Sequence, residues 1–278
     1  IEPIGESKSD YAIFSEIATK LNFKDKFTEG KDEDKWLRFI WDEARSKAKD
    51  EGFSLPEFDK FWKNGFQEVL SPKKQTILLE KFRIDPEKNP ISTPSGKIEI
   101  FSETVDSFNY EDCPGHPAWL EQTEWLGSNL TKQYPLQLIS GQPHNRLHSQ
   151  LDNGSESQSY KILGREPIKI HPQDAQARRL VDGDVVEVFN KRGRCLAGVI
   201  VSNEVMKGVV FLPVGAWYDP INDGEFCIHG NPNVLTEDIG TSSLAQGPSA
   251  HSTLIEIKKY TKELPEINIL HKPNIVNK

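Results

Sequence analysis

Apolar residues recur at helical spacing through the first 65 residues, and this pattern predicts a helical region. In the first segment Ile13, Ile17 and Leu21 lie four residues apart, so they share one face. Similar faces, rich in Trp and Phe, are predicted to form the core of this region, because aromatic side chains at this spacing are usually buried. The predicted helices span residues 7–22, about 32–50, and 54–65.

The pattern then changes to shorter, strand-like runs separated by turn residues. Residues 77–84 and 97–101 are predicted to be strands, and residues 102–108 a short helix. Residues 127–134 are predicted to link this region to the next, which places a domain boundary near residue 130.

Beyond residue 130, short apolar runs alternate with Gly-containing turns. A helix is predicted to begin at His171-Pro172 and to run through Arg178, and Asn190–Gly193 is predicted to be a hairpin turn. Several short strands with one helix are typical of a small closed barrel. The predicted strands are residues 136–139, 168–170, 185–189, 195–201, 208–212 and 254–257. Residues from about 262 onward are predicted to form an extended tail over the surface.

Composition and charge exclude several classes of protein. The 278 residues suffice for two domains, and the net charge of −8 argues against a nucleic-acid or anionic-membrane partner. The three cysteines, Cys113, Cys195 and Cys227, form no Cys-x-x-Cys motif, which excludes zinc ribbons and iron–sulfur clusters of that type. No apolar run approaches the roughly 20 residues of a membrane span.

The polar loop at residues 140–150 is the first candidate site. It follows a predicted buried strand, a position where ligands often bind. Gly141 allows close approach to the backbone, and Arg146 offers a planar fork suited to phosphate. The remaining donors are Gln142, His144, His148, Ser149 and Gln150. An ordinary hydrogen-bonded surface loop remains an alternative. A metal on the two histidines is disfavoured, because Pro143 interrupts a helix and no carboxylate is nearby.

Two later polar segments are further candidates. In residues 229–236, Asn231 and Asn233 offer paired donors and acceptors that suit the edge of a guanine or pterin. Residues 240–249 are small and polar and could wrap a ligand. Plain turns and a plain loop are the alternatives for both segments.

Three carboxylates lie near Trp217, and two of them could form a pair for acid–base chemistry. A solvated loop is the favoured interpretation of Asp219, Asp223 and Glu225. Arg165 and Glu166 are most simply explained as an ion-pairing edge.

Four motifs occur in an order that resembles the C-terminal part of the dimethyl sulfoxide reductase family of molybdoenzymes. They are residues 140–150, residues 165–175 with Asp182–Val185, residues 229–236, and residues 244–249. The resemblance covers residues 1 to about 260 and looks strongest for the branch of trimethylamine N-oxide and biotin sulfoxide reductases.

The resemblance implies an α+β architecture. Residues 1–130 would be the end of the substrate-funnel domains, and residues 131–278 a six-stranded double-psi β-barrel that binds molybdopterin dinucleotide. The implied cofactor is molybdenum held by two molybdopterin guanine dinucleotides. The implied cofactor-binding residues are Ser140, Gly141, Gln142, His144, Arg146, His148, Ser149, Asn231, Asn233, Gln246, Gly247 and Ser249. The implied reaction removes an oxygen atom from trimethylamine N-oxide, dimethyl sulfoxide or biotin sulfoxide.

The chain also departs from the family pattern. Family members are much longer, and the serine that ligates molybdenum in this branch lies in their N-terminal part. The start at Ile1, without methionine, also predicts a processed chain or a piece of a longer one. We therefore expect a C-terminal fragment that is inactive alone and contains no catalytic or metal-binding residue.

The expected partners are the remaining N-terminal domains, a small S-oxide or N-oxide, and a c-type cytochrome as electron donor, with no nucleic acid and no membrane span. The expected compartment is the bacterial periplasm rather than the cytoplasm. The competing hypothesis is a stand-alone double-psi barrel that binds a ligand without redox activity.

Overall fold

The structure is a computed structural model that describes residues 3–69, 77–221, 224 and 226–272. The chain divides into two compact units, Ile1–Pro90 and Ile91–Lys278. Each unit is described by itself. The domain boundary near residue 130, expected from the linker-like residues 127–134, stays a prediction.

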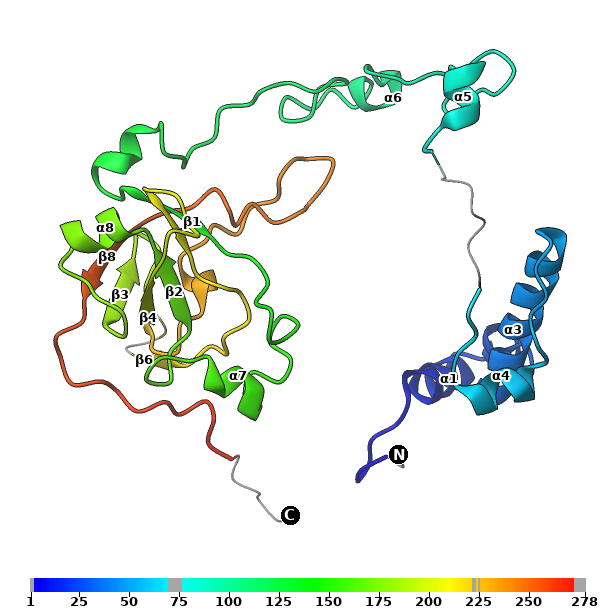
Figure 1. Ribbon diagram of the computed structural model, residues 1–278, viewed down its shortest axis with the longest axis horizontal. Coiled ribbons are helices and arrows are strands. Elements are labelled where there is room, and N and C mark those ends of the chain that lie inside the picture. The colour runs from blue at the N-terminus through cyan, green and yellow to red at the C-terminus, as the bar shows by residue number, and fades with distance from the viewer. Residues whose placement is uncertain (1–2, 70–76, 222–223, 225, 273–278) are drawn as a thin grey trace. The chain divides into compact units, whose positions relative to one another are not determined.

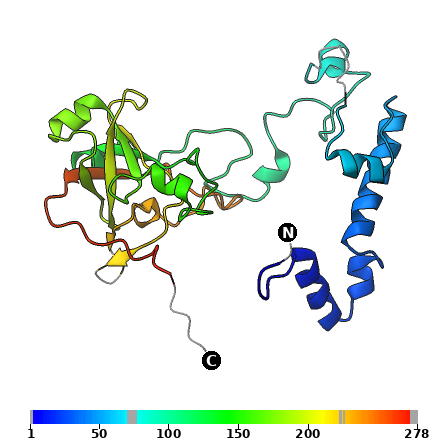
Figure 2. The same ribbon diagram turned by 60° about the horizontal axis from the view of Figure 1, so that its bottom comes forward.

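The first unit is helical, as expected (Figures 1 and 2). Its helices are α1 (Asp10–Lys20), α2 (Lys24–Thr28), α3 (Glu33–Asp50), α4 (Phe58–Asn64) and α5 (Glu80–Ile84). Helix α1 is shorter than predicted because Ser9 caps it, accepting a hydrogen bond from the Ala12 N–H. Helix α4 begins at Phe58 rather than near Ser54, since Glu57 occupies the N-cap position.

The first unit buries little apolar surface. Among its described residues, only Ala18, Thr28 and Phe58 are buried. Trp41 stacks on Phe61, with ring centroids 3.7 Å apart. The predicted core face of α1 is open instead: the exposed fractions of Ile13, Phe14, Ile17 and Leu21 are 41%, 55%, 45% and 62%. The periodicity correctly indicates an amphipathic helix, but the predicted burial is wrong because no element among the described residues of the unit covers this face.

The two strands predicted between residues 77 and 101 do not form. Residues 80–84 are helix α5 instead, consistent with the strong helix formers Glu80 and Lys81. Residues 97–101 form no strand, because no neighbouring segment offers a ladder of hydrogen bonds there. The short helix expected near residue 102 is confirmed as α6 (Glu103–Asp106), with Ser102 as its cap.

The second unit is built around the expected six-stranded barrel (Figure 1). The strands pair in the order β2–β5–β1–β8–β3–β4, and an additional β2–β4 pairing closes the ring. The pairs β1–β5 and β2–β4 are parallel, and the other four pairs in the ring are antiparallel. Closure gives the ladder no free edge within the ring. The strands are β1 (Leu136–Ile139), β2 (Pro167–Ile170), β3 (Val185–Phe189), β4 (Arg194–Val201), β5 (Val209–Phe211) and β8 (Leu254–Lys259).

Smaller elements decorate the ring. Strand β7 (Phe226–Cys227) pairs in parallel with β4, and β6 (Pro220–Ile221) pairs with β7. Two-residue strands are too short to show a period of two, which is why the sequence pattern missed them. Helix α8 (Pro172–Ala177) is confirmed, and α7 (Ser155–Ser159) and the turns η1 (Asn129–Lys132) and η3 (Pro232–Val234) complete the unit.

The barrel interior is a dense apolar core. Alternate residues of the strands, such as Leu136 and Leu138 on β1 and Ile168 and Ile170 on β2, are at most 1% exposed. A fully buried aliphatic side chain contributes about 1.5–3 kcal/mol. The core therefore fixes where each strand ends and its loop begins.

The C-terminal segment is extended over the barrel unit, as predicted. Leu264 and Ile267 pack against a buried cluster on β3, β4 and β7. The Asp219 carboxylate accepts the N–H groups of Asn268 and Ile269 at 2.7 and 3.1 Å. Asp219 is 5% exposed, so its interpretation as a solvated residue is wrong. Asp223 and Glu225 lie outside the described residues. No helix in the described ranges has the length and apolar character needed to cross a membrane.

Candidate functional site

Strand β1 delivers the polar loop 140–150 to one end of the barrel. The Ser140 N–H donates to His251 Nδ1 at 3.3 Å, and the Gly141 carbonyl accepts the Val214 N–H at 3.0 Å. The start of the loop is thus fixed to the segments after β5 and before β8. Ser140 Oγ is buried and has no hydrogen-bond partner among the described residues. A ligand could satisfy this hydroxyl.

Hydrogen bonds within the loop set its shape. Gln142 Oε1 accepts the His148 N–H at 2.9 Å, and Gln142 Nε2 lies 2.6 Å from His148 Nδ1. Gln142, His144, His148 and Ser149 are all exposed. These side chains can therefore be reached by a ligand from outside the barrel, and the Gln142 amide is also engaged with His148.

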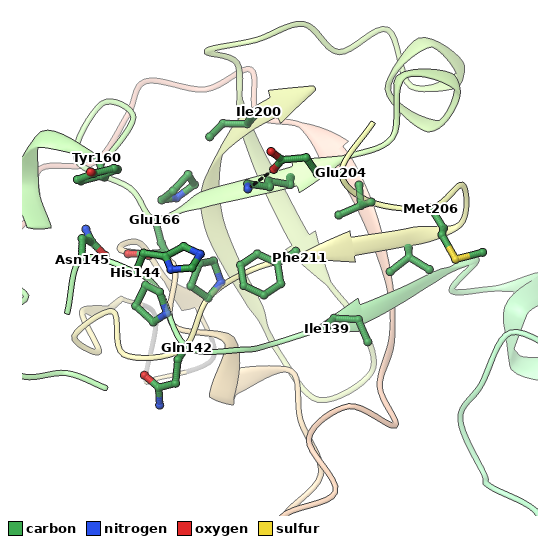
Figure 3. A pocket seen from close by; sticks show the side chains of 16 residues that line it. Ile139, Gln142, His144, Asn145, Tyr160, Glu166, Ile200, Glu204, Met206 and Phe211 are labelled. Atoms are coloured by element: carbon green, nitrogen blue, oxygen red, sulfur yellow. Dashed lines mark hydrogen bonds and ion pairs between the residues drawn. The ribbon is translucent and has the colours of Figure 1, made fainter. Parts of the chain in front are cut away.

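A cavity of about 560 Å³ opens beside this loop. Figure 3 shows His144 and Asn145 on one side, Met206 and Ile139 on the other, and Phe211 between them. The walls are largely apolar, and Lys169 and Glu204 form an ion pair at the cavity. Of the predicted site residues, Gln142 and His144 line it. A size of 300–1,000 Å³ is usual for a ligand pocket.

The Arg146 guanidinium points into the protein. Its side chain is 1% exposed, and Nη2 lies 3.0 Å from Glu166 and Nε 3.5 Å from Asp152. It also donates to the carbonyls of Val214 and His148 at 3.0 and 3.1 Å. Its donors are therefore engaged by protein acceptors, and the expected contact between Arg146 and a phosphate stays a prediction.

Arg146 belongs to a buried charged cluster that the sequence did not reveal. Lys161 Nζ lies 2.8 Å from Asp152 and 2.6 Å from Glu166, and all these side chains are at most 2% exposed. Burial raises the pKa of Asp152, but hydrogen bonds from Lys161 and the Trp217 N–H outweigh it, so the pKa falls below its ordinary value. Burial and the charge of Lys161 lower the pKa of His229. His229 is therefore neutral at pH 7 and hydrogen-bonds the Trp217 carbonyl at 3.0 Å.

The other two predicted segments do not line the cavity, and the first of them contacts the charged cluster. The Glu166 N–H donates to the His229 carbonyl at 3.1 Å, which ties the start of segment 229–236 to the charged cluster. Asn231 accepts the Asn233 N–H and caps η3. Neither asparagine lines the cavity.

Segment 240–249 forms an exposed loop closed by a bridge between Gly240 and Pro248. Gln246 donates to the Ser242 carbonyl, and Ser249 to the Ile239 carbonyl. These bonds define the loop, and Gly247 lies within it. None of its residues lines the cavity.

The side chains available at the loop fit a pterin dinucleotide. They are amide, imidazole and hydroxyl groups, and Gln142 and His144 adjoin an apolar wall that suits a heteroaromatic ring. Within the described residues, no group of three or more His, Cys, Asp or Glu could hold a metal ion. The donor set therefore suits the organic part of such a cofactor.

Comparison with known families identifies the barrel. The model of the family described as "Molydopterin dinucleotide binding domain" matches residues 136–254, which include five strands of the ring and the first residue of the sixth, β8. The predicted site residues from Ser140 to Ser249 all fall within this match.

Curated relatives resemble nearly the whole chain. The trimethylamine-N-oxide reductase of Haemophilus influenzae is 44% identical over 99% of this chain and 34% of its own length. Trimethylamine-N-oxide reductase 1 of Escherichia coli K12 is 46% identical over 96% of this chain and 32% of its own length. The dimethyl sulfoxide/trimethylamine N-oxide reductase of Rhodobacter capsulatus is 44% identical over 94% of this chain and 32% of its own length. The chain thus spans about a third of the length of these relatives.

The fold also has a solved counterpart. Acetylene hydratase from Pelobacter acetylenicus superposes with a TM-score of 0.68 at 20% sequence identity, covering 94% of this chain and 34% of that protein. At this identity the likeness shows the fold alone. The family match identifies residues 136–254 as a molybdopterin dinucleotide-binding domain, and over nearly its whole length the chain is similar to trimethylamine-N-oxide and dimethyl sulfoxide/trimethylamine N-oxide reductases, members of the family that the order of motifs resembles.

Proposed function

We propose that this chain is the cofactor-binding, C-terminal part of an oxidoreductase that reduces S-oxides or N-oxides. The substrate class is trimethylamine N-oxide, dimethyl sulfoxide or biotin sulfoxide. The observation that carries the proposal is the loop at the end of β1, whose Gln142 and His144 line a cavity inside the matched domain. Identities of 44–46% to N-oxide and S-oxide reductases support the substrate class.

The chain's own residues bind and orient the cofactor. Ser140, Gly141, Gln142, His144, Arg146, His148 and Ser149 would hold it from the β1 loop, and Asn231, Asn233, Gln246, Gly247 and Ser249 from the two later segments. When bound, a molybdenum ion held by two molybdopterin guanine dinucleotides supplies two-electron oxygen-atom transfer. The apolar cavity wall formed by Phe211 and Ile139 limits water beside the loop.

The partners belong to the same proposal. The relatives are about three times as long, so further domains would supply the metal ligand, the rest of the cofactor contacts and the substrate funnel. A c-type cytochrome is the proposed electron donor, and the bacterial periplasm the proposed compartment.

Alanine substitution of both cavity-lining donors tests the site. Gln142→Ala combined with His144→Ala is expected to weaken binding of molybdopterin guanine dinucleotide about 10-fold or more, because two hydrogen bonds are lost. Titration of the pterin fluorescence measures the affinity. Asn153→Ala is the control: Asn153 is exposed near the same loop and does not line the cavity. Equal affinities for the double variant and the control would contradict the assignment of these two donors.

The chain alone is expected to show no N-oxide reduction after incubation with the cofactor. A reduced viologen dye as electron donor and trimethylamine N-oxide as substrate provide the assay. Co-expression with the complementary two-thirds of the Escherichia coli relative is the control and is expected to restore turnover. Turnover by the chain alone would contradict its proposed role as one part of a reductase. Binding without turnover in both samples would favour a stand-alone binding module.

A further inference from the structure

Charged side chains from separate segments meet in the interior of the barrel unit. Arg146 and Asp152 flank the end of the β1 loop, Lys161 follows α7, Glu166 precedes β2, and His229 follows β7. The side chains of all five are at most 2% exposed. Of the five, Arg146 is also a predicted cofactor-binding residue, although its guanidinium is engaged within the cluster, and Glu166 also lines the cavity beside the β1 loop.

The cluster is balanced in charge. Two cations face two carboxylates, and His229 is neutral at pH 7 because burial lowers its pKa. Lys161 contacts both carboxylates, at 2.8 Å from Asp152 and 2.6 Å from Glu166. Removing one partner from such a buried set is strongly destabilising, because a charge is left without compensation. Without Lys161, two buried carboxylates would share the single cation of Arg146.

The cluster also joins the predicted cofactor segments to one another. Asp152 Oδ2 accepts the Trp217 N–H at 2.8 Å, and Trp217 Nε1 donates to the Ser149 carbonyl at 2.7 Å. The Trp217 carbonyl in turn contacts His229 at 3.0 Å, one residue before the turn at Gly230 that leads to Asn231. A shift of Asp152 would therefore be passed both to the β1 loop and to segment 229–236.

We propose that Lys161 is a positioning residue for the dinucleotide: through Asp152 and Glu166 it holds the β1 loop and segment 229–236 in one binding geometry. It does so without touching the ligand. The role rests on the proposed function of these two segments. Arg146 shares the task from the loop side, since it spans from Glu166 to the Val214 carbonyl.

Hydrogen exchange of the full chain tests the role without any cofactor. In Lys161→Met, the amides of His148, Gln150 and Trp217 are expected to exchange about 100-fold faster, while those of the β3–β4 ladder change by about 2-fold or less. These three amides donate to Gln142, Leu147 and Asp152 in the intact loop. Lys259→Met is the matched control, because Lys259 pairs with Asp184 at 2.8 Å while 47% exposed. It is expected to leave all of these rates unchanged.

A second variant separates charge balance from the loss of a contact. Lys161→Met combined with Glu166→Gln removes one cation and one carboxylate, so the expected acceleration falls to about 10-fold and stays confined to the loop. This variant also gives the result if the single variant does not fold. Unchanged loop exchange, or acceleration that is equal in the loop and the β3–β4 ladder, would overturn the proposal.

Cofactor titration keeps the two proposals apart. Molybdopterin guanine dinucleotide is expected to bind Lys161→Met at least about 10-fold more weakly than the unsubstituted chain at a temperature where both are folded. If the unsubstituted chain does not bind the dinucleotide, the proposed function fails while the exchange result still stands. If affinity is unchanged although loop exchange accelerates, the positioning role is overturned and the proposed function remains.

Discussion

Replacing Gly215 by alanine is expected to lower the free energy of unfolding of the barrel unit by about 4 kcal/mol. Gly215 has a φ of +96°, which L side chains rarely adopt, and a Cβ there would lie 1.8 Å from the His148 carbonyl oxygen. That oxygen belongs to the β1 loop and accepts a hydrogen bond from Arg146. The substitution therefore forces the loop and the chain after β5 apart. Urea denaturation followed by circular dichroism measures the change.

Gly183→Ala is the matched control for this prediction. Gly183 has a φ of +82°, so alanine there meets a similar backbone penalty, but no atom lies within 4 Å of the added Cβ. Its expected cost is about 1–2 kcal/mol. The difference between the two losses of unfolding free energy measures the cost of the steric clash between the added Cβ at position 215 and the β1 loop. Equal costs would mean that the backbone conformation alone accounts for the effect.

Replacing Arg192 by methionine is expected to cost about 3–5 kcal/mol at pH 7. Arg192 forms two hydrogen bonds with Glu124, at 2.6 and 2.9 Å, and the Glu124 side chain is 3% exposed. Glu124 also accepts the Leu254 N–H at 2.9 Å at the start of β8. The methionine variant leaves this buried carboxylate with only the exposed Lys191, 3.9 Å away, as a cation. Thermal or urea unfolding at several pH values measures the loss.

The cost of this substitution is expected to depend on pH with a definite sign. Burial raises the pKa of Glu124, but the hydrogen bonds from Arg192 and the Leu254 N–H outweigh it and lower the pKa below its ordinary value of 4.5. In the unsubstituted chain, Glu124 therefore adds stability that is present above pH 4.5 and lost as the pH falls through the folded-state pKa. Without Arg192, protonation instead relieves a buried charge. The difference between the two proteins should shrink as the pH falls from 7 toward 4.

Lys191→Met is the control for Arg192. Lys191 is the preceding residue and lies 3.9 Å from Glu124 and 3.6 Å from Glu237, but its side chain is 58% exposed. Exposed ion pairs contribute about 0–1 kcal/mol, so this variant should lose little stability at any pH. If Lys191→Met lost as much stability as Arg192→Met, the net charge of the region rather than the buried ion pair would account for the effect.

Local patterns predicted the elements whose neighbours lie close in the sequence. The hairpin turn at Asn190–Gly193 brings β3 and β4 together, with Val188 paired to Cys195, as its sequence suggested. Asp32 caps α3 at the residue where the prediction started that helix. Apolar runs gave all six strands of the ring because a strand buried on the barrel wall needs such a run. The order of motifs indicated the family, which the comparisons confirmed.

The errors have one physical origin: they concern partners far away in the chain. The apolar face of α1 indicated a helix, but whether Ile17 is covered depends on which element lies against it. The apolar run at residues 77–84 predicts a strand, but a strand forms only where another segment supplies its hydrogen bonds. Strand β7 forms from two residues because β4 lies beside it.

The sequence alone thus predicted helices α1, α3, α4, α6 and α8, the six-stranded barrel and the family, because periodicity, caps, turns and motif order are local properties of the chain. Only the tertiary structure decided which charged side chains pair with one another. Arg146 looked suited to a phosphate, yet its guanidinium lies 3.0 Å from Glu166, a residue 20 positions away, beside a lysine that no pattern singled out. Buried charges must be paired, and only the path of the chain decides which partners meet.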